Sequence, residues 1–222
     1  STLAAYSYNA NVATAVAKTI AEAKICGNGS VTSTSTTDKI IVKVIGNGKA
    51  EATNEQPKVS VSGINIAANV NTATFGATQR AIIDGPTVSG KTGVEVTSTF
   101  NEGGKEAAIA YIGGTGVSAS LVGAGVSTAV ATAAVTSIAK VSNASMGEAG
   151  KAASLKVTSN GSSIARADVC QPNVSLNLAS LSVNVLIAKS TSTFTAEAGG
   201  GIMWKKGQPY SKNACSNGPA CI

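Results

Sequence analysis

The sequence predicts a mainly β fold, made of antiparallel sandwich or barrel-like units in two tandem pseudo-repeats that each open with a short helix. Three observations lead to this prediction. Short segments of alternating apolar and polar residues recur between Gly-, Asn- and Ser-rich breaks, as in sandwiches and barrels. Aromatic residues make up only 4% of the 222 residues, so Val, Ile, Leu and Ala must fill the core. Segments of the first half also recur in the second half.

The internal repetition rests on three matches in the same order. VATA at 12–15 recurs at 130–133, an offset of 118 residues. VKV at 42–44 matches LKV at 155–157, an offset of 113 residues. Gln-Pro at 56–57 recurs at 171–172, an offset of 115 residues. This period is far longer than that of solenoid repeats. The sequence therefore predicts an N-terminal tail (1–8), a first unit (9–118) and a second unit with a cysteine-containing tail (119–222).

Each unit is expected to open with a helix. Val12, Val16 and Ile20 recur every four residues, and Gly27 follows the segment, which is the pattern of an amphipathic helix with a glycine at its end. The corresponding segment of the second unit runs from Val130 to Ile138. Its Val and Thr residues also favour a strand.

Strands are expected after each helix. Residues 39–45 are rich in β-branched side chains and end at the turn sequence Gly46-Asn47-Gly48, a common hairpin signal. Residues 59–66 alternate between apolar and polar with a break at Gly63. Further strand-like segments are 94–96, 107–112, 117–121, 174–178 and 183–185.

The four cysteines are disulfide candidates: Cys26, Cys170, Cys215 and Cys221. None forms a CxxC pair and the chain has no histidine, so no metal site is expected. An even number of such cysteines predicts two disulfides in an oxidising compartment. The short loop between Cys215 and Cys221 is the first choice, which leaves Cys26 with Cys170.

Composition points to export. Charged residues make up 13% of the chain, about half the share usual in globular proteins, and the first residue is Ser1 rather than Met. We therefore expect a secreted protein, extracellular or at the cell surface. No apolar run is long enough for a membrane span. The lysines are scattered without interleaved aromatic residues, so nucleic acid is not an expected partner.

Two motifs resemble catalytic sequences, and neither has the right context. Residues 85–92, GPTVSGKT, match a phosphate-binding loop, but residues 93–97 predict a strand where that loop requires a helix. Residues 137–140 and 91–93 match the SxxK and KTG elements of penicillin-binding enzymes in the wrong order. Without histidine or a recognisable carboxylate pair, we expect neither an enzyme nor a cofactor.

The remaining hypothesis is an extracellular structural subunit that assembles with copies of itself into a filament, pilus-like fibre or surface layer. Leu3, Tyr6 and Tyr8 mark the tail as a candidate strand for donation to a neighbour. Cell-surface polysaccharide is a second candidate partner. The alternative is a secreted monomeric binding module for carbohydrate, ice or mineral, suggested by Thr-x-Thr patterns at 32–36, 72/74, 97/99 and 191/193. An enzyme is the least favoured alternative.

Overall fold

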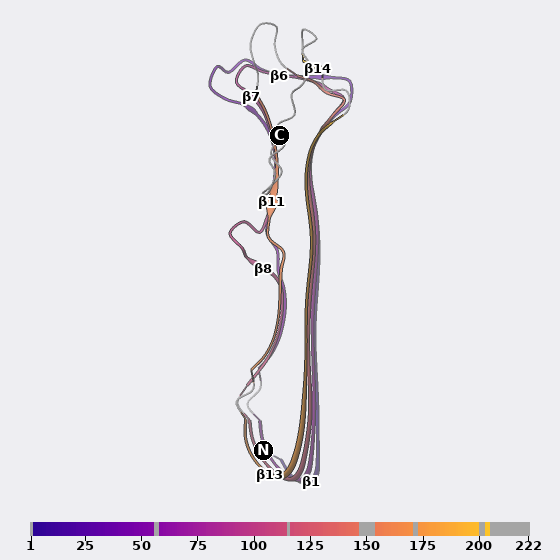
Figure 1. Cartoon of the computed structure of the whole chain (residues 1–222), viewed down its shortest axis with the longest axis vertical. Coiled ribbons are helices and arrows are strands. Elements are labelled where there is room, and N and C mark those ends of the chain that lie inside the picture. Colours follow the sequence, from indigo (N-terminus) through magenta and orange to yellow (C-terminus); the bar gives the residue numbers. More distant parts are fainter. Residues whose placement is uncertain are drawn as a thin grey trace.

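The structure is a parallel β-solenoid with two unequal walls (Figure 1). It is a computed structural model that describes residues 2–55, 58–114, 116–146, 154–170, 173–199 and 203–204. Within these ranges the regular secondary structure is entirely β-strand, and all strand pairs are parallel. The expectation of a mainly β chain is confirmed.

The first wall consists of four long strands that stack in chain order. They are β1 (Thr2–Cys26), β5 (Lys58–Asp84), β9 (Gly116–Ser142) and β13 (Asn173–Gly199). Since an extended strand rises about 3.3 Å per residue, each runs for about 80–90 Å along the molecule. We call this sheet the long wall.

The second wall returns the chain through three shorter strands in each coil. The first coil has β2 (Ser30–Ser33), β3 (Ile40–Gly46) and β4 (Ala50–Glu55). The second coil has β6 (Thr87–Gly90), β7 (Gly93–Phe100) and β8 (Glu106–Gly113). The third has β10 (Ser145–Met146), β11 (Ser154–Gly161) and β12 (Ile164–Cys170), and β14 (Met203–Trp204) pairs with β10.

One coil is half as long as the repeat detected in the sequence. Lys58 pairs with Gly116, one coil later, and Gly116 pairs with Asn173 after another coil of nearly equal length. Positions two coils apart are therefore separated by about the offsets of the three sequence matches. We call residues that pair at the same height on successive long strands a column. Val59, Val117 and Val174 form one column, so the offset of the Gln-Pro match, 115 residues, equals the spacing of paired residues two coils apart. The predicted unit boundaries are not tested by this pairing and stay a prediction.

The predicted helices are wrong. Residues 12–20 lie in β1 and residues 130–138 lie in β9. A spacing of four places side chains on one face of a helix, but four is also a multiple of the two-residue period of a strand. Val12, Val16 and Ile20 are 74%, 62% and 83% exposed on the outer face of the long wall, while the alanines between them face the interior.

The predicted antiparallel arrangement is also wrong. Turn-like sequences such as Gly46-Asn47-Gly48 connect β3 to β4, which belong to different sheets, so they turn corners of the coil rather than hairpins. The partner of each strand lies a whole coil away in sequence. Alternation of apolar and polar residues marks a strand and its inner face, but it does not reveal the direction or the identity of the neighbour.

Three of the long strands, β1, β5 and β9, end at a corner that requires a positive φ. Gly27, Gly85 and Asn143 have φ of 103°, 91° and 49°, a region that glycine adopts without strain and asparagine tolerates. The corners stack, because Gly27 N donates to Asp84 O at 3.1 Å and Gly85 N donates to Ser142 O at 3.2 Å. Gly27 is thus a corner of the coil rather than the end of a helix.

The interior holds two apolar clusters with a polar layer between them. In the first, alanines of β4, β5, β8 and β9 surround Phe75 and Phe100, whose ring centroids are 5.5 Å apart. The second contains Val42, Ile83 and other aliphatic side chains, and it lies where β5 and β9 end. Between them, three buried serines from β7, β9 and β11 join the walls: Ser98 Oγ lies 2.7 Å from Ser137 Oγ, and Ser159 Oγ donates to Ser137 Oγ at 3.0 Å.

Replacement of Phe75 by Ala is expected to lower the free energy of unfolding by about 3–5 kcal/mol, because it leaves a cavity among side chains that are too small to fill it. Urea unfolding followed by circular dichroism measures the change. Ile20→Ala is the control, since this side chain is 83% exposed, and its effect should stay within about 0.5 kcal/mol. A large loss for Ile20→Ala would contradict the outward orientation of this side chain.

Candidate assembly edges and outer face

The long wall has two open edges. β1 and β13 are the end strands of the sheet, and no described strand pairs with the outward side of either. Each strand presents a row of unpaired backbone N–H and C=O groups over 25 or 27 residues. Native proteins usually protect such edges with short strands, proline or a cap. Neither strand contains proline.

The inner face of β13 is covered only in part. Phe194, Ala196 and Ala198 pack against the interior clusters. In the described residues only β14 of the second wall follows β12 and β13, so much of β13 extends beyond that wall. Leu186 shows the consequence: it is 50% exposed, while Ala129, its column partner on β9, is fully buried. The β13 end of the solenoid therefore offers both an open backbone edge and a partly exposed interior.

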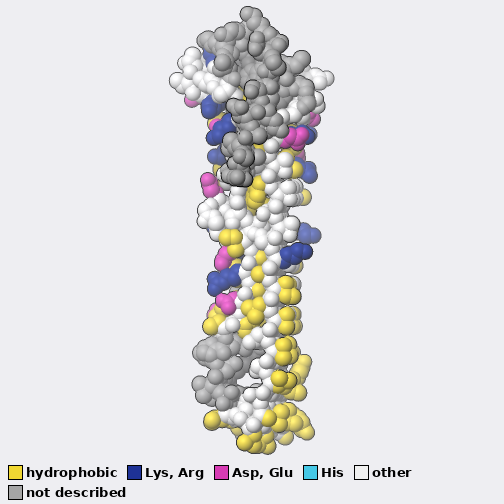
Figure 2. Space-filling model, in the orientation of Figure 1, with side chains coloured by type: hydrophobic (Ala, Val, Ile, Leu, Met, Phe, Trp, Pro, Cys, Tyr) yellow, Lys and Arg dark blue, Asp and Glu magenta, His cyan; other side chains and the backbone are white. Residues whose placement is uncertain are grey.

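The outer face of the long wall is divided into an apolar half and a polar half. The half nearer the N-terminal residue carries exposed aliphatic and tyrosine side chains, and charged side chains gather on the rest of the molecule (Figure 2). The apolar members are Tyr6, Tyr8, Val12, Val16, Ile66, Val70, Val122, Val126, Leu181, Val183, Val185 and Ile187. Apolar patches this extensive usually mark contact surfaces.

Threonines form columns on the same face, beyond the apolar half. Thr78, Thr136 and Thr193 occupy one column across three strands, and Thr74 lies beside Thr132. Of the predicted Thr-x-Thr pairs, 72/74 and 191/193 lie on the long wall. The pair 97/99 lies on β7 of the second wall, where both side chains are buried.

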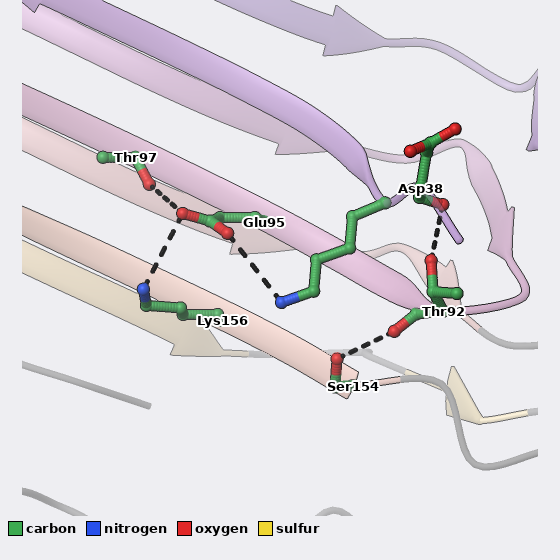
Figure 3. Close-up of polar contacts among 7 residues, drawn as sticks. Asp38, Thr92, Glu95, Thr97, Ser154 and Lys156 are labelled. Carbon is green, nitrogen blue, oxygen red and sulfur yellow. Dashed lines mark hydrogen bonds and ion pairs between the residues drawn. The ribbon is translucent and has the colours of Figure 1, made fainter.

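Charged side chains are paired between successive coils. On the second wall, Glu95 Oε2 lies 4.0 Å from Lys39 Nζ, and Glu95 Oε1 lies 3.8 Å from Lys156 Nζ (Figure 3). One carboxylate is thus held between two lysines from the coils on either side. On the long wall, Lys140 Nζ lies 3.4 Å from Glu197 Oε2. Such exposed pairs add little stability individually, but they favour one alignment of the coils.

A further charged group joins β8 and β12. Arg166 lies 3.5 Å from Glu106 and 3.1 Å from Asp168. The hydrogen bond to Asp168, together with the charge of Glu106, raises the pKa of the Arg166 guanidinium above its ordinary value. It is therefore a fixed positive charge at the open edge of the second wall.

The predicted tail residues lie at the start of an edge strand. Leu3, Tyr6 and Tyr8 pair in register with Val61, Ile64 and Ile66 of β5. Residues 2–8 are therefore continuous with the rest of β1 and expose Tyr6 and Tyr8 on the outer face. Sequence reasoning missed the matching edge on β13. The signal that could have revealed it is a weaker recurrence at half the detected period.

Two of the disulfide candidates are free and exposed. Cys26 is the last residue of β1, and Cys170 is the last residue of β12. Cys26 lies where β1 ends, whereas Cys170 stands three residues before the start of β13, toward the other end of the long strands. A disulfide requires Cα atoms within about 7 Å. The Cys26–Cys170 pairing is not formed. Cys215 and Cys221 lie outside the described residues.

Residues 85–92 do not have the local structure of a phosphate-binding loop. They pass from the Gly85 corner through β6 to a turn, and β7 follows where a phosphate-binding loop would need a helix. Thr92 Oγ1 donates to the Asp38 carbonyl and Ser154 Oγ donates to the Thr92 carbonyl (Figure 3). These bonds fix the turn between coils. The described residues contain no cluster of three or more His, Cys, Asp or Glu side chains suited to a metal ion.

No protein-family model, curated protein or solved structure matches this chain. In the part of the chain that the structure describes, no helix could cross a membrane.

The free thiols give a direct test of the coil geometry. Cys26 and Cys170 are both exposed, so both should react with a maleimide reagent in the native protein. Mass spectrometry of the digested protein measures the labelling, and labelling after reduction is the control. If both residues stayed unlabelled until reduction, the two cysteines would have to lie closer together than they do here.

Proposed function

We propose that this protein is an extracellular structural subunit that assembles end to end into a filament, with the β1 edge of one copy pairing with the β13 edge of the next. The observation that carries this proposal is the pair of long, parallel, unprotected edges at the two ends of one sheet. Backbone pairing along an exposed edge is an established mode of association.

The two edges are different surfaces, so their contact is head to tail. A heterologous contact of this kind produces an open filament when successive rotations do not close. In a solenoid the next copy continues the stacking direction of the coils. The wall spacing, the strand direction and the inner and outer faces are already shared by both edges, because β1 and β13 are strands of one parallel sheet.

The exposed apolar half supports assembly rather than a monomeric state. Soluble monomers seldom leave a contiguous apolar surface of this size on a flat sheet. The small number of charged residues gives no support to a catalytic role. Among the described residues there is no cluster of side chains suited to a metal ion, and Cys26 and Cys170 are free, exposed thiols. Secretion and a role outside the cell belong to the proposal and follow from the composition.

Purified protein should form long unbranched filaments by negative-stain electron microscopy, with a critical concentration measurable by sedimentation. The double variant Val183→Lys/Val185→Lys adds two positive charges to the β13 edge and should abolish or strongly reduce polymer, because charged edge residues prevent strand pairing. Both valines are partly exposed, so the fold should persist, which circular dichroism checks.

The matched control is Val126→Lys/Thr128→Lys, which places the same charges in the same two columns on β9, away from the edges. Val126 and Val183 are 47% and 45% exposed. Edge pairing predicts polymer from this control. Loss of polymer in the β9 variant with normal polymer in the β13 variant would contradict the proposal and point to contact through the outer face.

A second candidate function is attachment to an ordered surface such as ice or crystalline polysaccharide. It rests on the threonine column Thr78, Thr136 and Thr193 on a flat sheet, where neighbouring strands repeat at about 4.8 Å.

Thermal hysteresis and pull-down on crystalline polysaccharide test this candidate. Activity of the wild type that is lost in Thr78→Lys/Thr136→Lys, but kept in Ile41→Lys on the second wall, would support it. Ile41 is 58% exposed and lies outside the threonine columns. No activity in the wild type would remove it.

A further inference from the structure

We infer that the end-to-end contact has one register, in which Lys24 of the next copy lies beside Glu197 and Asn11 of the next copy lies beside Asn184. This inference rests on the proposed function and deepens it. It names the residues that align two copies and the alignments that they exclude.

The register follows from the columns of the long wall. Lys24, Ile82, Lys140 and Glu197 occupy one column from β1 to β13. If a second copy continues the coil without a shift, its Lys24 becomes the next member of this column. Glu197 already has Lys140 on one side at 3.4 Å, so the new lysine would flank it on the other side.

The chain already contains a similar arrangement once. Glu95 lies between Lys156, its paired residue on β11, and Lys39, which stands two residues before Ile41, its paired residue on β3 (Figure 3). Lys140 and Glu197 supply two members of such a group, and among the described residues no second lysine pairs with Glu197. The open edge of β1 supplies one at the matching position.

Shifted alignments are penalised on either side. A shift of one residue would turn the inner face of β1 outward. A shift of two residues in one direction would place Glu22 beside Glu197, and in the other direction it would place Lys18 beside Lys189. In the unshifted register, Lys18 lies beside Thr191 and Lys189 beside Val16. Like charges on adjacent strands are destabilising, so both two-residue shifts are disfavoured.

The inner face gives independent support. Within the chain, Asn11 Nδ2 donates to Asn69 Oδ1 at 3.0 Å on the adjacent strand. The same column continues through Ser127 to Asn184, whose side chain is exposed at the open edge. The unshifted register places Asn184 beside Asn11 of the next copy. The shift that brings Glu22 beside Glu197 would place Asn184 beside Asn9, and the opposite shift would place it beside Ala13, so the amide contact excludes the second of these shifts. The unshifted register also places Phe194 beside the small Ala21.

The charge contact is tested with Lys24→Glu, which puts two carboxylates side by side across the contact and leaves the Lys140–Glu197 pair intact. The critical concentration should rise by about three- to tenfold at low salt, and less in 0.5 M salt because the charges are exposed. Lys18→Glu is the matched control: it makes the same charge change on the same face of β1, but beside Thr191, and should shift the critical concentration by less than about twofold.

Reversal of all three charges should restore assembly. In Lys24→Glu/Lys140→Glu/Glu197→Lys, the column again alternates in sign, and the critical concentration should return to within about twofold of the wild type. Equal effects of Lys24→Glu and Lys18→Glu, or no rescue by the triple variant, would overturn the charge alignment.

Cysteine cross-linking tests the register directly. Lys18→Cys/Thr191→Cys places the two thiols on adjacent strands of neighbouring copies at about 4.8 Å between Cα atoms, within disulfide range. Within one chain the same positions are three strands apart, about 14 Å, so a bridge between them must join two copies. Mild oxidation of filaments should give a ladder of covalent oligomers, and digestion should yield the 18–191 cross-linked peptide.

The off-register controls are Lys18→Cys/Lys189→Cys and Lys18→Cys/Thr193→Cys, which should give no such peptide. Filaments in which one of these controls cross-links instead would overturn the register but leave end-to-end assembly intact. Absence of any wild-type polymer by electron microscopy would instead overturn the proposed function, so the two failures are distinguishable.

Discussion

In-register parallel pairing of the four long strands is the interaction on which the rest of this structure depends. It repeats once in every coil, and each column of the long wall is defined by it. The corners, the stacked phenylalanines and the layer of serines all require equivalent residues of successive coils to lie at the same height. A single parallel sheet buries little apolar side-chain surface by itself, so the second wall must cover its inner face. The small alanine side chains of the interior allow the two walls to approach closely.

The same pairing creates the two edges on which the proposed assembly rests. A sheet that grows by adding parallel strands ends with one strand open on each side, and nothing in the geometry of the ladder stops its growth. Small proteins of this kind need caps to stay monomeric. The described residues of this chain present two matching edges instead, with opposite charges and amide side chains at corresponding positions. In the proposed filament, fold and assembly are two consequences of one backbone interaction.

Part of the fold follows from the sequence. The mainly β class and the strand at residues 39–45 were predictable, because β-branched residues and two-residue alternation act locally. The break expected at Gly63 is absent, because β5 runs through this residue. The predicted helices were wrong, because Val12, Val16 and Ile20 satisfy both periods and only burial distinguishes them. Leu3, Tyr6 and Tyr8 were found because they are unusual in composition, whereas Glu197 and Lys24 carry no local signal.

The sequence by itself determined the composition of the two faces, the turn residues and a recurrence near 115 residues. These depend on side chains close together in the chain. The tertiary structure alone decided that the recurrence spans two coils, that the strands are parallel and that Cys26 and Cys170 lie toward opposite ends of the long strands. It also decided which charges share a column. The physical reason is that pairing between strands a whole coil apart is non-local: each strand carries its own pattern, but its neighbour is chosen by how all coils close together.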